Sequence, residues 1–183
     1  MSEALLLVDI QNDYFKNGAM ELVNMENAAE NAAILLALFR KKSLPVYYCR
    51  HIALREGATF FLPDTEGSEI HQSVWPSQDE SVIVKRFPNS FRETVLLSQC
   101  HKDRVDTLVI CGAMSHMCID ATTRAAFDLG FKCIVVEDAC ATKNLEFKGR
   151  KISFLDVHSA FMAALDTVFA SVVSVKHFTK REA

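Results

Sequence analysis

Hydrophobic residues gather in six short runs along this chain, and polar or amphipathic segments separate each run from the next. The runs cover residues 4–10, 44–51, 81–86, 106–113, 132–139 and 171–176. Continuous apolar runs of this length are typical of strands whose two faces are both covered, as in a parallel sheet between helices. The pattern therefore predicts six strands in a mostly parallel sheet.

The segments between the runs predict helices and one long insertion. Apolar residues recur at helical spacing over residues 24–42, 89–103, 118–129 and 149–170, and Gly130 ends the third of these helices. Residues 52–81 lack such spacing, and a loop of that length in a compact domain usually serves function. Strands that alternate with helices predict an α/β fold. We expect three α/β/α layers around a six-stranded, mostly parallel, Rossmann-like sheet, in a single domain over residues 1–183.

The composition is that of an ordinary globular protein. Half of the 183 residues are hydrophobic (50%), 23% are charged, and the formal net charge is −3. This charge provides no basic field for nucleic acid or anionic lipid, and no apolar stretch reaches the roughly 20 residues that cross a bilayer. The start "MSEALLLVDIQND" is acidic and its apolar run is short, unlike a secretory signal. We therefore expect a cytoplasmic protein that binds a small molecule and neither nucleic acid nor membrane.

The cysteines do not form a recognisable metal or redox motif. They are Cys49, Cys100, Cys111, Cys118, Cys133 and Cys140. No Cys-x-x-Cys pair occurs, which argues against a zinc ribbon or a thioredoxin-type couple. Those inside apolar runs are most simply small buried side chains, so we expect free thiols in a reducing compartment.

Chemically active residues stand where the predicted strands end. In open parallel sheets, ligands bind outside the carboxyl ends of the strands. The residues at these ends are Asp9, His51, Lys85, the 112–118 loop, Glu137 and Asp138. An aspartate, a lysine and a cysteine are therefore expected to meet at one crevice.

These three residues suit covalent catalysis by an activated thiol. Cys118 opens a predicted helix, where free N–H groups and the helix dipole favour an anion and lower thiol pKa values. Lys85 would supply a nearby cation, and Asp9 would act as general base. Each residue also has a structural interpretation: Cys118 as core filler or metal ligand, Asp9 as a turn or capping residue, and Lys85 as a solvated strand end.

Three segments in order resemble one enzyme family. They are "LLLVDIQNDYF" (5–15), "VIVKRFPNSF" (82–91) and "VICGAMSHMCIDATTRAAFDLGF" (109–131). The first contains a D-x-Q-x-D-[FY] opening, the second contains a lysine followed by Ser90 and Phe91, and the third contains a G-x-x-[ST]-x-x-C-[VI] elbow. Together they resemble the isochorismatase-like cysteine hydrolase superfamily, which includes nicotinamidases, N-carbamoylsarcosine amidases and other amide or ureido hydrolases. The resemblance runs from the first strand to about residue 142.

The resemblance implies a role for each motif residue. Asp9 becomes the base, Lys85 the cationic member and Cys118 the nucleophile of a triad. A non-proline cis peptide is implied between Ala113 and Met114, and the N–H groups of Met114 and Cys118 are implied to form the oxyanion hole. The family also implies a homodimer or homotetramer and no cofactor.

The sequence pattern of the nicotinamidase metal site is incomplete in this chain. Their Asp-x-His on the second strand reads Cys49-x-His51, so that His51 is left with Asp64 and His71, which are more distant in the sequence. We therefore expect a metal-free type. The role of these three residues stays open.

Candidates for the substrate pocket come from three parts of the chain. Phe15 and Trp75 are aromatic residues that suit either a pocket wall or the core. Asn12, Ser115 and His116 are placed to contact substrate or to orient the elbow. For His116, the alternatives are setting specificity or capping the helix.

We expect a hydrolase that cleaves a C–N bond of a small amide, ureido or carbamoyl compound through a cysteine thioester. The alternatives are isochorismatase-type or nicotinamidase activity, and a non-catalytic member that binds a small molecule or responds to redox state through Cys118. The sequence does not identify the substrate.

Overall fold

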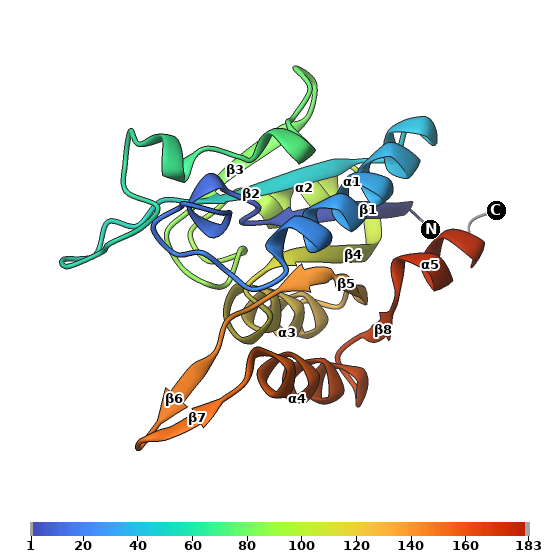
Figure 1. The fold of residues 1–183 in the computed structure, drawn as a ribbon. Coiled ribbons are helices and arrows are strands. Elements are labelled where there is room, and N and C mark those ends of the chain that lie inside the picture. Colours follow the sequence, from blue (N-terminus) through green and yellow to red (C-terminus); the bar gives the residue numbers. More distant parts are fainter. Residues whose placement is uncertain (1, 182–183) are drawn as a thin grey trace.

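The computed structural model describes residues 2–181 and has an α/β architecture (Figure 1). Its elements, in chain order, are β1 (Ser2–Val8), α1 (Met25–Lys41), β2 (Val46–His51), β3 (Ser81–Lys85), α2 (Leu96–Lys102), β4 (Val105–Ala113), α3 (Asp120–Asp128), β5 (Lys132–Ala141), β6 (Leu145–Phe147), β7 (Arg150–Ile152), α4 (Phe154–Asp166), β8 (Ser171–Val173) and α5 (Val175–Arg181). Short 3₁₀ turns lie at Asn12–Tyr14, Glu66–Ser68 and Gln72–Val74, and one turn of π-helix lies at Ser115–Ile119.

Six strands form one parallel sheet in the order β3-β2-β1-β4-β5-β8. This confirms the predicted sheet. From β1 the chain builds outward through β2 and β3, and then returns to the other side of β1 with β4. The order therefore reverses between β1 and β4, and such a switch point opens a crevice at the carboxyl ends of the two strands.

Helices cover both faces of the sheet, as adjacent residues of β2 illustrate. The hydroxyl of Tyr48 contacts Arg40 of α1, whereas the hydroxyl of Tyr47 donates to Asp103 immediately after α2. Successive side chains of a strand point to opposite faces, so α1 and α2 lie on opposite sides. The ring of Phe178 in α5 stacks on Phe39 of α1 with centroids 6.2 Å apart, which puts α5 on the α1 side. The three-layer prediction is confirmed.

The core explains why the second half of β1 is entirely apolar. Leu5, Leu6, Leu7 and Val8 of β1 are at most 1% exposed. All six cysteines are buried and free, as expected. Within residues 2–181, no helix combines the length and apolar character needed to cross a membrane.

The last third of the chain differs from the prediction. The predicted helix over residues 149–170 begins only at Phe154, because Gly149 turns the chain at φ 79° and residues 145–152 pair as the antiparallel hairpin β6–β7. The predicted strand over residues 171–176 ends at Val173, where the Asp138 carboxylate accepts from the N–H of Val175 and α5 begins.

Two earlier helices are also shorter than predicted. The segment 89–103 is helical only over Leu96–Lys102. The predicted helix over residues 118–129 is α3 from Asp120, preceded by the π-helical turn that contains Cys118. The insertion has no strand and only two 3₁₀ turns over residues 52–80, as predicted, and its last predicted residue, Ser81, begins β3.

Candidate active site

The crevice between β1 and β4 brings Asp9 close to the Cys118 loop because β4 has a glycine there. Gly112 has φ 123°, and a Cβ at this position would overlap the carbonyl oxygen of Val8. Only glycine permits this approach of two backbones. Asp9 itself follows β1 with φ 54°, and its N–H donates to the carbonyl of Cys49 at 2.9 Å. The two loops therefore leave the sheet side by side.

The elbow that carries Cys118 begins with a cis peptide and continues as a π-helical turn. The peptide bond between Ala113 and Met114 is cis, where the resemblance placed it. The carbonyl of Met114 accepts from the N–H groups of Met117 at 3.0 Å and Ile119 at 3.2 Å. The N–H of Cys118 lies between these two donors and does not bind that carbonyl. A π-helical turn is a frequent feature of functional sites.

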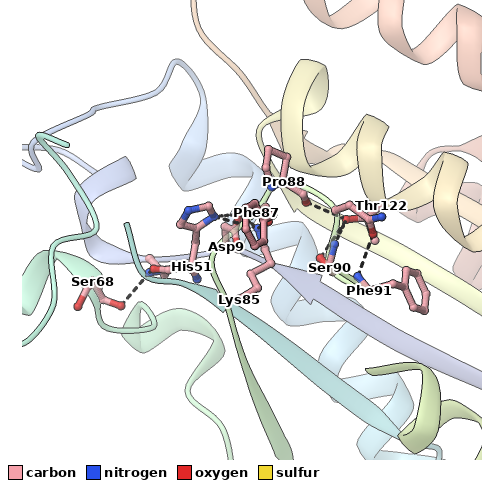
Figure 2. Close-up of polar contacts among 11 residues, drawn as sticks. Asp9, His51, Ser68, Lys85, Phe87, Pro88, Ser90, Phe91 and Thr122 are labelled. Atoms are coloured by element: carbon pink, nitrogen blue, oxygen red, sulfur yellow. Dashed lines mark hydrogen bonds and ion pairs between the residues drawn. The ribbon is translucent and has the colours of Figure 1, made fainter. Parts of the chain in front are cut away.

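Lys85 is buried and its ammonium group has three hydrogen-bond partners (Figure 2). Its Nζ lies 2.8 Å from Oδ2 of Asp9, 3.1 Å from Nδ1 of His51 and 3.2 Å from the carbonyl of Phe87. An ammonium has three protons, so these partners use all of them. The side chains of Lys85 and Asp9 are both 0% exposed, and the site therefore contains a fully buried ion pair. The interpretation of Lys85 as a solvated strand end is wrong.

The chain after Lys85 is fixed to the helix that follows Cys118. Ser90 donates its N–H to Oγ1 of Thr122 at 3.1 Å, and the two hydroxyls lie 2.9 Å apart. Thr122 also donates to the carbonyl of Pro88 (Figure 2). Both Ser90 and Thr122 are completely buried. The serine in the lysine motif thus links the loop after β3 to α3, the helix that follows Cys118.

The polar residues of the opening motif hold the insertion over the site. The Gln11 side chain donates to the carbonyls of His51 and Ser68 and accepts from the N–H of His51 at 2.7 Å. The Asp13 carboxylate accepts from the N–H groups of Phe61 and Ala19. Residues 60–68 are therefore tied to the chain that follows β1.

The second carboxylate oxygen of Asp9 is available to take a proton. Oδ1 is buried and has no hydrogen-bond partner among residues 2–181. A carboxylate oxygen of Asp9, a ring nitrogen of His51 and Sγ of Cys118 all lie within 4.8 Å of one another. Because Oδ2 is engaged by Lys85, Oδ1 is the oxygen that can act as a base beside the sulfur.

Electrostatics keep the Cys118 thiol protonated at rest, which corrects the expectation of a lowered pKa. Burial raises the pKa of Cys118, and the Asp9 carboxylate raises it further against the opposing effect of Lys85. Burial acts to lower the pKa of Lys85, but Asp9 and the neighbouring cysteines together hold that pKa above its ordinary value. Lys85 acts to lower the pKa of Cys118, but burial and the Asp9 carboxylate outweigh it.

His51, whose role the sequence left open, lies inside the site as an acceptor. Burial lowers its pKa, so the imidazole is neutral near pH 7 and its Nδ1 accepts from Lys85. Asp9, His51 and Cys118 are the only potential metal-binding group of three or more such residues in the described chain. The Lys85 ammonium, however, already binds both Asp9 and His51, so a metal cation there would meet a like charge.

The nicotinamidase-type metal site does not form. Asp64 is exposed on the insertion. The ring of His71 stacks on Phe15 with centroids 3.6 Å apart, and its Nδ1 contacts the hydroxyl of Ser73. Neither residue joins His51 in the potential metal-binding group described above.

The predicted pocket residues separate into two places. Asn12, Phe15 and Trp75 line a surface cavity of about 390 Å³ together with His71. Ser115 and His116 instead anchor the elbow to neighbouring elements. The hydroxyl of Ser115 contacts Nδ1 of His158 at 2.9 Å, and Nδ1 of His116 lies 2.6 Å from the hydroxyl of Thr142.

Glu137 and Asp138, which we expected at the crevice, lie within β5 and line a different cavity. The β5 strand runs on to Ala141, so these two residues stand before its carboxyl end. The position of the strand end was wrong in the prediction.

Tyr14 is a site residue that the sequence interpretation did not single out. It is 2% exposed, and its ring packs 4.5 Å from that of Phe61. Burial raises its pKa, and the charges of Cys118 and Asp9 act in the same direction, so the phenol is protonated and close to both. Its hydroxyl has no hydrogen-bond partner in the described chain. The sequence signal that could have identified Tyr14 is the aromatic position at the end of the D-x-Q-x-D-[FY] motif.

The chain is similar over nearly its whole length to proteins of one family. A family model described as the isochorismatase domain matches residues 3–176. The isochorismatase family protein YddQ of Bacillus subtilis (strain 168) is 52% identical over 180 residues, which cover 98% of this chain and 100% of that protein. A crystal structure assigned as an isochorismatase hydrolase from Oleispira antarctica has a TM-score of 0.92 at 48% identity, covering 97% of this chain and 95% of the other. Nicotinamidase 3 of Arabidopsis thaliana is 27% identical over 182 residues, covering 93% and 88%. The family match extends from β1 to β8.

The buried ion pair gives a stability prediction. Replacing Lys85 with Met leaves the Asp9 carboxylate buried without a counter-ion, and we expect the free energy of unfolding to fall by about 3–5 kcal/mol. The double variant Asp9→Asn, Lys85→Met removes both charges, and it should recover a substantial part of the loss. Urea unfolding of the wild type, both single variants and the double variant measures the coupling. Equal stability of Lys85→Met and wild type would contradict a buried pair.

The partly buried histidines give a prediction for pH. Burial lowers the pKa values of His51, His71, His116 and His158. Unfolding restores them to about 6.5, so below that pH the unfolded chain binds protons that the folded chain does not. We therefore expect the free energy of unfolding to fall as the pH is lowered from 7.5 to 5.5.

Urea unfolding at a series of pH values measures this fall. The His51→Gln variant keeps an acceptor for Lys85 and removes one titrating group, so its fall should be smaller. A wild type that becomes more stable toward pH 5.5 would show that the imidazoles are charged in the folded state.

Proposed function

The chain belongs to the isochorismatase family of hydrolases, and from the arrangement of its site we propose that it is a metal-independent cysteine hydrolase of small amides. The proposed substrates contain a C–N bond next to a carbonyl, in an amide, ureido or carbamoyl group. One observation carries the proposal. A buried Asp9–Lys85 pair stands beside Cys118, and one oxygen of that aspartate has no other partner.

The first half-reaction would form a thioester. Sγ of Cys118 attacks the carbonyl carbon as its proton passes to Oδ1 of Asp9, and the carbonyl oxygen becomes an oxyanion. The N–H groups of Met114 and Cys118 are the proposed donors to that oxyanion. When the oxyanion collapses, the C–N bond breaks and Asp9 returns the proton to the leaving nitrogen. Ammonia or an amine departs, and the acyl group stays on Cys118.

The second half-reaction would restore the enzyme. Asp9 takes a proton from a water molecule as the water oxygen attacks the thioester carbon. Collapse of this intermediate breaks the C–S bond, and the sulfur receives the proton from Asp9. The product is a carboxylic or carbamic acid, and the resting thiol is regenerated. Lys85 remains charged throughout and neutralises Asp9 whenever the carboxylate is ionised.

The protonated resting thiol supports this order of events. A thiol with a raised pKa is a weak nucleophile, so the proton must leave as the C–S bond forms. Asp9 is positioned to accept that proton. A nicotinamidase relative supports amide hydrolysis in general terms, at 27% identity.

Removal of the nucleophile tests the proposal. We expect Cys118→Ala to lower ammonia or amine release by at least about 10³-fold, with unchanged unfolding free energy within about 1 kcal/mol. The assay is ammonia release across a panel of small amides, ureas and carbamoyl compounds that includes nicotinamide. Cys133→Ala, which also removes a buried thiol, is the matched control and should retain activity.

Mass spectrometry of the same reactions distinguishes the alternatives. Acyl adducts confined to Cys118 are expected during turnover. Turnover by Cys118→Ala at the wild-type rate would refute the mechanism. Sulfenic acid on Cys118 with neither adducts nor release across the panel would instead favour the redox-responsive alternative.

Tyr14 is proposed to donate a hydrogen bond to the substrate through its unpartnered hydroxyl. Tyr14→Phe removes only this hydroxyl, so we expect kcat/KM to fall about 3- to 10-fold, the loss typical of one neutral hydrogen bond. Steady-state kinetics on the best substrate of the panel measure the effect. Tyr47→Phe, whose hydroxyl bonds to Asp103 away from the crevice, is the control. An unchanged kcat/KM in Tyr14→Phe would remove the hydroxyl from the binding site.

A further inference from the structure

The β6–β7 hairpin extends from the body of the protein without a neighbouring strand. It forms a separate two-stranded sheet, and Figure 1 shows it projecting beyond the α4 end of the molecule. Residues 146–151 are all exposed, and Phe147 at the tip is 66% exposed. A lone two-stranded hairpin is only marginally stable in water. The projecting hairpin with its exposed aromatic side chain is therefore a candidate docking surface.

The hairpin is basic. It contains three basic residues, Lys148, Arg150 and Lys151, and one acidic residue, Glu146. The cations and Phe147 lie within the same few residues, and Lys148 Nζ lies 5.5 Å from the centroid of the Phe147 ring. The binding partner of this hairpin should therefore combine acidic groups with an apolar floor.

A cavity of this chemistry lies at the base of the hairpin. It has a volume of about 500 Å³ and is enclosed by α1, the end of β5 and the start of α4. Every ionised side chain of its lining is acidic: Glu30, Glu137 and Asp138. Burial lowers the pKa of His158 in its wall, so that imidazole adds no positive charge near pH 7. Phe154 and Leu155 supply the apolar part.

We propose that the hairpin of one copy of this chain inserts into the acidic cavity of a second copy, and the reverse. Charge complementarity between two parts of the same chain selects a second copy as the occupant. The hairpin also begins just after Thr142 and ends just before Phe154, both of which line the cavity. The hairpin, here called the arm, and the cavity therefore lie next to each other. A two-fold axis beside them lets the arms of both copies exchange at once. Such a contact is closed and self-complementary.

The exchanged arm would contact the support of the nucleophile loop. His158 lines the cavity, and its Nδ1 lies 2.9 Å from the hydroxyl of Ser115 in the elbow. On the other side of the imidazole, Oε2 of Glu137 lies 3.8 Å from Nε2 of His158. The partner's arm therefore reaches side chains that position the elbow, although the dimer itself does not depend on the proposed catalysis.

Paired charge reversals test the proposal directly. The arm variant is Lys148→Glu with Arg150→Glu, and the cavity variant is Glu30→Lys with Glu137→Lys. In each variant, arm and cavity carry the same sign of charge. We expect the dissociation constant of the homodimer, measured by sedimentation equilibrium, to rise by about 100-fold or more in both, because like charges then face each other.

An equimolar mixture of the two variants is the decisive sample. Each arm then meets a cavity of opposite charge, so a one-to-one pair should form with a dissociation constant within about 10-fold of the wild type. The control reverses two exposed cations at the C-terminal ends of α1 and α2, Lys41→Glu with Lys102→Glu, and should dimerise like the wild type. A wild type that stays monomeric at 100 µM (about the upper range of the method), reversed variants that dimerise normally, or a mixture that does not pair would each overturn the proposal.

A second experiment avoids charge reversal in case those variants do not fold. A tagged Phe147→Cys chain is mixed with an untagged Leu155→Cys chain under mild oxidation. The exchanged arm places the two new thiols in one cavity, so a disulfide-linked pair of chains is expected on a non-reducing gel. The wild type, whose six cysteines are buried, is the control. Absence of the linked pair at concentrations where the wild type dimerises would place the interface elsewhere.

Discussion

The ion pair between Lys85 and Asp9 is the interaction on which the rest of the site depends. Both side chains are fully buried, and a buried charge is tolerated only when its partners are complete. Lys85 meets this condition with Asp9, His51 and the Phe87 carbonyl. Asp9 follows β1, His51 ends β2 and Phe87 follows β3, so the three hydrogen bonds of Lys85 join the carboxyl ends of three strands.

The same pair controls the sulfur beside it. Lys85 favours the thiolate of Cys118, but burial and the Asp9 carboxylate act more strongly in the opposite direction. Burial then keeps the thiol protonated. The fold supplies a base next to the thiol, because the close approach of β1 and β4 at Gly112 brings the loop that contains Asp9 beside the elbow. Reactivity here comes from proximity of donor and acceptor rather than from a resting ionised group.

The sequence was sufficient for the sheet and for the meeting of Asp9, Lys85 and Cys118 at one crevice, because both follow from local signals. Six apolar runs marked the strands, and Asp9, Lys85 and Cys118 stand where such strands end. The hairpin at Leu145–Ile152 gave no such signal, since its strands are three residues long and exposed. The thiol pKa could not be predicted either, because it depends on burial and on the pairing of Lys85 with Asp9. Asn12, Phe15 and Trp75 were grouped by chemistry, but the insertion carries them to a separate cavity.

The saturation of Lys85 also constrains how this site can change over evolutionary time. Its three hydrogen bonds use all three ammonium protons. A substitution at Asp9 or His51 therefore leaves the buried ammonium of Lys85 with an unpaired proton, and a substitution at Lys85 leaves the buried carboxylate of Asp9 without a counter-ion. A lineage that altered this centre would have to replace at least two positions together, or pass through a poorly folded ancestor. Diversification of substrate is therefore easier on the insertion and the outer walls, where single replacements leave the charged interior intact.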